Sequence, residues 1–337
     1  MSRDLKIIHV GLGPIGIGIA RMVLAKEGLK VVGACDPAAE KANKDLGDVL
    51  GLGKKLRIKV AGDPVKFIKS AKADVAVVST TSSAKVVKAT IEALISRGIN
   101  VVTTCEEFAY PVPANAKVFR DLDVIARKKK VTVLGTGVNP GFAMDALPIV
   151  LTGICQDVQK IYVDRIQDAS IRRLPFQKKI GATLTPAEFE NLVKTKAVRH
   201  VGLTESISML ADALGFKVDR IVDEIKPKIA TETVKSPFLT VEPGQVCGLI
   251  QDGIGYRGKE AVITLHMEAY LGAPETYDEV RIEGSPNLKV RAIGGYHGDI
   301  ATASIVVNSL PKVIDAKPGL HTMRTLPIPS FFRGAVA

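Results

Sequence analysis

Short apolar segments alternate with amphipathic ones through the first 140 residues. Apolar runs rich in β-branched residues and bounded by turn residues predict strands at Lys6–Val10, Val31–Cys35, Asp74–Ser79, Asn100–Thr104 and Thr132–Gly135. Between them, apolar residues recur at helical spacing over Ile15–Lys26, Ala84–Arg97 and Ala114–Lys130. Because strands that alternate with helices form βαβ units, this part predicts a doubly wound parallel sheet with helices on both faces, an α/β fold.

After Pro140 the segments become longer and polar residues mix with apolar ones. Strands are predicted at Gln159–Asp168, Val246–Tyr256, Ala261–Ala269, Glu279–Glu283 and Leu288–Ile293, and helices at Pro186–Thr195 and Thr204–Leu214. This pattern predicts an α+β domain with a largely antiparallel sheet and helices on one face. The apolar helical segment Asp299–Leu310 is expected to return to the first domain.

The length of 337 residues fits two domains. We expect the first over residues 1–140, completed by about 297–337, and the second over 141–296. Hydrophobic residues make up 46% of the chain, which is enough for a sizeable core. Tryptophan is absent and aromatic residues are 5%, so that core is predicted to be aliphatic.

Charge and cysteine usage exclude several classes of function. The net charge is +11, but acidic residues are interleaved with the basic ones and no aromatic platform accompanies them, so no nucleic-acid partner is expected. No apolar run approaches the ~20 residues of a membrane span, and no signal peptide is recognised, so no membrane association is expected. The four cysteines lack metal-ligand spacing, which predicts reduced thiols, no metal and a cytoplasmic location.

The strongest local motif is Gly11-Leu12-Gly13-Pro14-Ile15-Gly16, which follows a predicted strand and opens a predicted helix. In this context Gly11 permits a tight turn, Gly13 lets a pyrophosphate approach the backbone, and Gly16 lets helix and strand pack closely. The helix start supplies amide donors. Pro14 at the first turn loses little from its missing N–H. The motif predicts a Rossmann-type dinucleotide site.

Further cofactor contacts are predicted at the ends of other strands. Asp36 ends the second strand, where a carboxylate binds the ribose hydroxyls and favours NAD, although the nearby Lys41 and Lys44 leave NADP open. Ser79, Thr80 and Thr81 follow another strand and are either ribose or pyrophosphate contacts or a polar turn that caps the next helix through Ser82 or Ser83.

Two motifs at strand ends are candidates for the chemistry. Thr104-Cys105-Glu106-Glu107 places two carboxylates beside the expected position of the nicotinamide, where a glutamate could hold a substrate amine or activate water. The alternative is a solvated pair at a helix start. Gly137-Val138-Asn139-Pro140-Gly141-Phe142 offers the Asn139 amide; a structural turn into the second domain would by itself explain the glycines, but it explains Asn139 less well.

These motifs together resemble the 2,4-diaminopentanoate dehydrogenase family and its relatives, the native amine dehydrogenases. The resemblance extends over nearly the whole chain through the downstream motifs Asp164-Arg165, Val201-Gly202-Leu203, Gly298-Asp299-Ile300-Ala301-Thr302 and Pro318-Gly319-Leu320. The resemblance implies NAD(P)-dependent oxidative deamination of a primary amine to a ketone and ammonia, or the reverse. It also implies a homodimer and a central glutamate, either Glu106 or Glu107. In this reading the first domain binds the dinucleotide, and the second serves the substrate and dimerisation.

The resemblance also places pocket residues: Asn139, Phe142, Arg165, Asp168, Arg173 and His200. Arg165 or Arg173 could bind a substrate carboxylate, or both could belong to a salt-bridge network within the sheet. The alternatives to the amine chemistry are another two-domain reductase, similar to dihydrodipicolinate reductase or homoserine dehydrogenase, and a non-catalytic NAD-binding protein. The Lys-containing catalytic segments of the two reductases are not found in the sequence.

Overall fold

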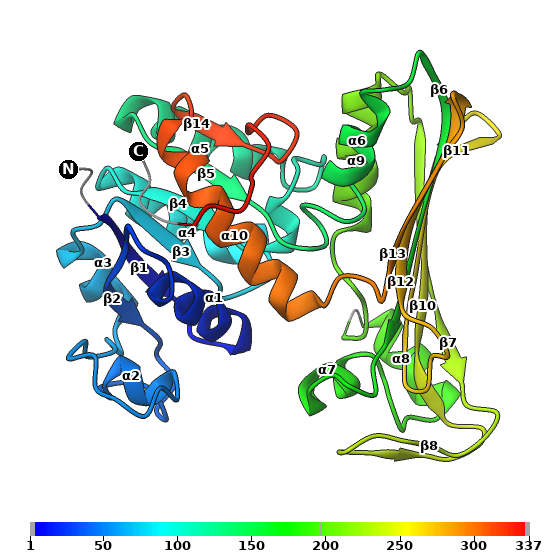
Figure 1. Ribbon diagram of the computed structural model, residues 1–337, viewed down its shortest axis with the longest axis horizontal. Coiled ribbons are helices and arrows are strands. Elements are labelled where there is room, and N and C mark those ends of the chain that lie inside the picture. Colours follow the sequence, from blue (N-terminus) through cyan, green and yellow to red (C-terminus); the bar gives the residue numbers. More distant parts are fainter. Residues whose placement is uncertain (1–3, 196, 334–337) are drawn as a thin grey trace. The chain divides into compact units, whose positions relative to one another are not determined.

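The computed structural model describes residues 4–195 and 197–333. The chain forms two compact units (Figure 1). We call Met1–Phe142 together with His297–Ala337 the N-terminal unit, and Ala143–Tyr296 the middle unit. Among the described residues, no helix has both the length and the apolarity that crossing a bilayer requires.

The N-terminal unit is built on a six-stranded sheet in the order β14-β5-β4-β3-β1-β2. All neighbouring strands in it are parallel. This confirms the predicted doubly wound sheet. Its strands are β1 (Leu5–Val10), β2 (Leu29–Cys35), β3 (Val75–Val78), β4 (Asn100–Thr103), β5 (Thr132–Gly135) and β14 (Gly319–His321).

Helices cover both faces of this sheet. On one face α4 (Ala84–Ser96) and α5 (Ala116–Lys129) share an aliphatic core with the strands. On the other face α1 (Pro14–Leu24) packs against α10 (Gly298–Asp315), so the helix predicted to return to the first domain does so (Figure 1). Short helices complete the unit: α2 (Leu46–Val49), α3 (Pro64–Ser70) and the 3-10 turn η1 (Glu106–Phe108).

The middle unit contains a second six-stranded sheet, in the order β13-β12-β6-β11-β10-β7. Strands β6 and β11 are parallel and the other neighbours are antiparallel, which confirms a largely antiparallel sheet. Its strands are β6 (Asp157–Asp168), β7 (Arg220–Ile229), β10 (Val246–Arg257), β11 (Glu260–Tyr270), β12 (Tyr277–Ser285) and β13 (Leu288–Ile293).

The helices of the middle unit lie on one side of this sheet (Figure 1). The close packing of the helix that carries Ile207 against the sheet depends on two glycines of β10. A Cβ at Gly255 would lie 2.9 Å from the Ile207 side chain, and one at Gly253 would lie 3.1 Å from it. The remaining elements are α6 (Ala146–Thr152), α7 (Leu174–Lys179), α8 (Pro186–Lys194), α9 (Leu203–Leu214) and the hairpin of β8 (Val234–Lys235) and β9 (Thr240–Val241).

Candidate active site

The glycine loop between β1 and α1 contains two glycines that the fold requires and one that faces open space. A Cβ at Gly11, where φ is +93, would lie 2.5 Å from the Ser79 carbonyl oxygen, and one at Gly16 would lie 2.2 Å from the Gly11 oxygen. A Cβ at Gly13 would meet no atom within 4 Å. The first turn of α1, with Pro14 and Ile15, has no side-chain cap. This arrangement fits a dinucleotide pyrophosphate.

Asp36 connects the end of β2 to this loop. Its carboxylate accepts hydrogen bonds from the amides of Leu12 at 2.8 Å and Ala38 at 2.9 Å, and Lys41 Nζ lies 3.3 Å away. Burial disfavours the charged carboxylate, but these donors outweigh burial and hold the pKa of Asp36 below its ordinary value. Asp36 is therefore an ionised acceptor at the position where a cofactor ribose would lie.

The segment Ser79–Thr81 is bound to the protein's own backbone in this structure. The Ser79 hydroxyl donates to the Gly11 oxygen at 2.9 Å, and Thr81 Oγ1 accepts from the Ser83 amide at 3.2 Å. Ser83 is the N-cap of α4, but its side chain makes no capping bond. The contacts therefore favour a structural role for the Ser79 hydroxyl, while Thr80 is exposed beside the loop.

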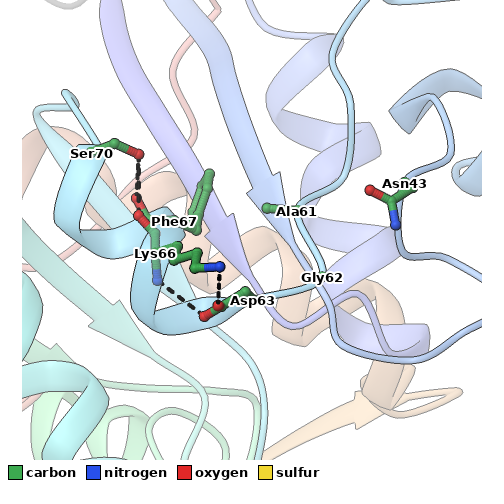
Figure 2. A pocket seen from close by; sticks show the side chains of 7 residues that line it. All are labelled: Asn43, Ala61, Gly62, Asp63, Lys66, Phe67 and Ser70. Carbon is green, nitrogen blue, oxygen red and sulfur yellow. Dashed lines mark hydrogen bonds and ion pairs between the residues drawn. The ribbon is translucent and has the colours of Figure 1, made fainter.

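A surface depression of about 510 Å³ lies next to the Asp36 turn (Figure 2). It is linked to that turn through Ala61, whose carbonyl oxygen accepts from the Asp36 amide at 3.0 Å. Its one carboxylate, Asp63, is occupied in capping α3 through the amides of Val65 and Lys66. None of its residues was predicted from the sequence. They are Asn43, Ala61, Gly62, Asp63, Lys66, Phe67 and Ser70.

The two adjacent glutamates after β4 have different surroundings. Glu107 Oε2 accepts a hydrogen bond from the Ala84 amide at 3.0 Å, and the Glu107 backbone oxygen accepts from Asn115 Nδ2 at 2.6 Å. Glu107 thus joins this turn to the start of α4. Glu106 is half-buried, and its carboxylate has no hydrogen-bond or ion-pair partner within residues 4–195 and 197–333.

The residues beside the glutamates fix the turn and contribute no ionised group. Thr103 Oγ1 donates to the Val78 oxygen at 3.0 Å and accepts from the Cys105 amide at 3.2 Å. Thr104 follows, half-buried, and its amide bonds to the Val78 oxygen. Burial, followed by the charges of Glu106 and Glu107, raises the pKa of the Cys105 thiol far above its usual range. Cys105 is therefore neutral and no thiolate nucleophile is present there.

The end of β5 packs directly against the glutamate turn, and a loop follows it. A Cβ at Gly135 would lie 2.0 Å from the Phe108 backbone oxygen, so only glycine fits there. Thr302 of α10 holds the loop by accepting from the Val138 amide at 3.3 Å. Asn139 is 8% exposed in this loop. The structure therefore brings the Glu106 turn and the predicted residue Asn139 onto neighbouring strand ends, whereas Phe142 ends the first of the two segments that form the N-terminal unit.

In the middle unit, the predicted residue Arg165 is already engaged. It is 3% exposed; its guanidinium lies 2.6 Å from Asp278 Oδ1 and donates to the Tyr296 carbonyl oxygen at 2.8 Å. The Tyr296 amide in turn donates to Asp278 Oδ2 at 2.7 Å. Removing one partner would leave a buried unpaired charge. Of the two interpretations of Arg165, these contacts favour the internal ion pair over carboxylate recognition.

The other predicted residues of the middle unit lie at the end of β6 and on two loops. Asp168 Oδ1 accepts from the Ser170 amide at 2.9 Å, and Arg173 is the half-buried N-cap of α7. The side-chain amide of Gln251 makes two hydrogen bonds to the backbone of His200. Its Oε1 accepts from the His200 amide and its Nε2 donates to the His200 carbonyl oxygen, each at 3.0 Å. Gln251 was not predicted, because nothing local distinguishes a glutamine that bonds a loop from one that faces solvent.

Comparison with known proteins identifies the families that the chain matches. The family described as 2,4-diaminopentanoate dehydrogenase C-terminal domain matches residues 142–337, and the one described as Dihydrodipicolinate reductase, N-terminus, matches residues 5–107. The 2,4-diaminopentanoate dehydrogenase of Acetoanaerobium sticklandii is 33% identical over 98% of this chain and 95% of its own length.

Solved structures agree with these matches. An amine dehydrogenase from Mycobacterium smegmatis aligns with a TM-score of 0.87 and 25% identity, covering 98% of each chain. A probable dehydrogenase from Thermotoga maritima shares the fold, with a TM-score of 0.58 and 13% identity over 95% of this chain and 91% of its own.

Fold and site thus define a two-domain, NAD(P)-binding dehydrogenase of the Rossmann type. More narrowly, the chain belongs to the 2,4-diaminopentanoate dehydrogenase family, whose members are oxidoreductases that act on amines. This confirms the family inferred from the motifs. The C-terminal match also sets the chain apart from the dihydrodipicolinate reductases, with which it shares the N-terminal match.

Proposed function

We propose that this chain oxidises the CH–NH2 group of a small amine or diamino acid to a ketone and ammonia with NAD(P), and catalyses the reverse amination. The observation that carries the proposal is the contrast between the two glutamates. Glu107 is committed to the start of α4, whereas Glu106 keeps a half-buried carboxylate without a partner in the described chain. We therefore assign the amine-binding role to Glu106.

Glu106 would act on protons at the amine. Its carboxylate accepts a proton from the substrate ammonium, and the neutral amine that remains can release a hydride from its carbon. When bound, the nicotinamide accepts that hydride. Glu106 then gives this first proton to solvent, so that it can accept the proton that water loses on adding to the substrate iminium carbon. It passes that second proton to the nitrogen, and ammonia leaves as the carbon–nitrogen bond breaks and the hydroxyl proton goes to solvent.

For the cofactor we propose NAD as the preferred form. The ionised Asp36 would repel a 2′-phosphate, and its amide donors keep it charged. Lys41 at 3.3 Å from Asp36 reduces this repulsion, so NADP is a slower alternative rather than an excluded one. The residues proposed to hold the dinucleotide are Gly11, Gly13, Pro14, Ile15, Gly16, Asp36, Thr80, Thr81, Thr104 and Asn139.

A pair of neighbouring substitutions tests the assignment. Glu106→Gln should lower kcat by about 10²–10⁴-fold, the usual contribution of a general base, with NADH affinity unchanged. Glu107→Gln keeps an oxygen acceptor for the Ala84 amide, so it should retain most of the activity. The assay is NADH oxidation with ammonia and a panel of small ketones, compared with keto acids. Equal losses in both variants, or full activity of Glu106→Gln, would contradict the role of Glu106.

We also propose a homodimer formed through the outer face of the middle sheet. This face carries alternating residues of β10 and their cross-strand neighbours, among them Ile250, Asp252, Ile254, His266 and Glu268. The helices of the unit lie on the opposite side (Figure 1). Half-buried isoleucines interleaved with charges of both signs, among them the Lys228–Glu268 ion pair, suit a self-complementary contact between two copies. Four free cysteines are compatible with the proposed cytoplasmic location.

A further inference from the structure

The side chain of Asn115 binds both ends of the segment that follows Glu106. Asn115 is 4% exposed. Its Nδ2 donates to the Glu107 carbonyl oxygen at 2.6 Å, and its Oδ1 accepts from the Val112 amide at 2.8 Å. Since a side-chain amide offers both donor and acceptor atoms, this single group closes residues 107–112 into a loop. The residue directly after the candidate amine-binding carboxylate is therefore fixed by a side chain eight positions further along the chain.

Asn115 makes these contacts in place of the one expected at its position. It is the N-cap of α5, where an asparagine oxygen ordinarily accepts from an amide of the first helical turn. No described amide of α5 receives that hydrogen bond. The helix therefore begins without its usual cap, and the side chain that could supply it is bound to the turn that carries Glu106 instead. Departures of this kind from a local rule are typical of functional sites.

Other contacts hold the same turn on its remaining sides. The Glu107 amide donates to the carbonyl oxygen of Ser82, just before α4, at 3.2 Å. The Phe108 ring is 0% exposed and stacks on Phe119 of α5, with ring centroids 4.5 Å apart. All of these residues belong to the N-terminal unit. The turn is therefore held from the start of α4 and from α5, and the asparagine amide is its polar tie to α5.

We propose that Asn115 is a positioning residue for the amine chemistry, one that holds the Glu106 carboxylate where it meets the substrate amine. This inference rests on the proposed function. Without the asparagine amide, the Glu107 carbonyl group and the Val112 amide lose their partners, and the turn must shift to find others. Because a misplacement of about 1 Å can cost about 10²-fold in rate, the loss falls on kcat. The change leaves the glycine loop and Asp36 untouched, so NADH should bind as before.

Asn115→Ala tests this role. We expect kcat for amine oxidation and for amination to fall about 10- to 100-fold, with the NADH dissociation constant and the number of NADH sites per chain unchanged. Asn100→Ala is the matched control, at the opposite end of β4 from the turn. The Asn100 side chain also bonds two backbone groups, the Asp74 carbonyl oxygen at 2.9 Å and the Thr132 amide at 2.8 Å. Its loss should lower the melting temperature by a similar amount, yet leave kcat per NADH site within about threefold of the wild-type value.

A double-mutant cycle separates positioning from stability. If Asn115 acts through Glu106, adding Asn115→Ala to Glu106→Gln should lower kcat by less than about threefold, because the carboxylate that it would misplace is already gone. A purely structural role would instead lower kcat by the same factor in both backgrounds, through the fraction of folded protein. That result, or wild-type kcat in Asn115→Ala, would overturn the positioning role.

Asn115→Ser keeps the test falsifiable if Asn115→Ala does not fold. Serine is a good N-cap, so it can cap α5, but it is shorter and lacks the amide donor. It should therefore fold and still show the loss of kcat, and wild-type kcat in this variant would overturn the positioning role. Absence of amine turnover in the unmodified chain, or full activity of Glu106→Gln, would instead overturn the proposed function and this inference with it.

Discussion

A histidine whose ring makes no hydrogen bond within the described residues lies inside the sheet of the N-terminal unit. His9 of β1 is 0% exposed, and neither of its ring nitrogens has a partner among the described residues. Burial lowers the pKa of His9 from 6.5 to about 4. At a pH between these two values the ring is therefore neutral in the folded protein, whereas the same ring is protonated in the unfolded chain.

This difference predicts how stability depends on pH. Between pH 6.5 and about 4 the unfolded chain binds a proton that the folded chain does not, so stability falls as the pH falls, by about 3 kcal/mol in total at 1.36 kcal/mol per pH unit. His9→Leu removes the proton site and both unbonded nitrogens. It should raise the free energy of unfolding at neutral pH and flatten its decline toward pH 4. Denaturant unfolding at pH 7.5 and 4.5 measures this, and parallel declines in the two proteins would contradict it.

The residues whose roles could not be predicted have partners far away in the sequence. The amide that binds the Glu107 carboxylate is 23 residues before it, and the aspartate paired with Arg165 is 113 residues after it. Nothing near either residue indicates those contacts. The glycine loop, in contrast, was predictable, because the positive φ of Gly11 and the close approach of Gly16 to the Gly11 oxygen arise within a strand, a turn and a helix that are consecutive in the chain.

At the scale of elements, strands β7 and β14 were not predicted, because neighbouring strands rather than a local sequence pattern determine them. Strand β7 combines charged residues with Pro227, and proline cannot donate to a neighbouring strand. It is accommodated because β7 is at the edge of the sheet, a position that only the folded order reveals. Strand β14 has three residues, too few for a periodic pattern, and is stabilised by pairing with β5.

The loop between β1 and α1 allows the binding and folding roles of glycine to be separated. Gly13→Ala adds a methyl group where no protein atom lies within 4 Å, so the fold should be unaffected. The same methyl group occupies the space that the pyrophosphate needs, so NADH should bind about tenfold or more weakly, a loss of roughly 1.4 kcal/mol.

Gly16→Ala is the matched variant for this comparison. Its Cβ would lie 2.2 Å from the Gly11 backbone oxygen, so β1 and α1 must move apart. We expect a melting temperature several degrees lower, as for other overpacked sites that cost about 1–3 kcal/mol. Fluorescence titration with NADH and thermal unfolding measure the two effects. If Gly13→Ala binds NADH normally, the pyrophosphate does not approach this loop.

At the scale of the whole molecule, the outer face of the middle sheet is a feature that the proposed chemistry does not use. Across its centre, Asp252 and Glu268 contact the two ring nitrogens of His266 at 2.7 and 3.2 Å. Burial disfavours the charged ring, but the two carboxylates outweigh it and raise the pKa of His266. A face that holds an imidazole between two acids, flanked by isoleucines, has both the apolar area and the charged groups that a specific contact needs.

Two isoleucine substitutions test whether that contact is a dimer. Ile254 lies on the outer face, with Thr264 and Val222 as its cross-strand neighbours. Ile254→Lys should leave the monomer folded, because the lysine stem can lie along the sheet while its ammonium group reaches water. In a dimer, however, the charge would be buried against the second copy, and dissociation should follow. Ile154→Lys makes the same change at an isoleucine that is 70% exposed outside the sheet, so it should not alter assembly.

Light scattering during gel filtration reports the mass of each variant against the 35.9 kDa chain. If Ile254→Lys remains a dimer, the contact lies elsewhere; if the unmodified chain is a monomer, the outer face has no second copy to bind.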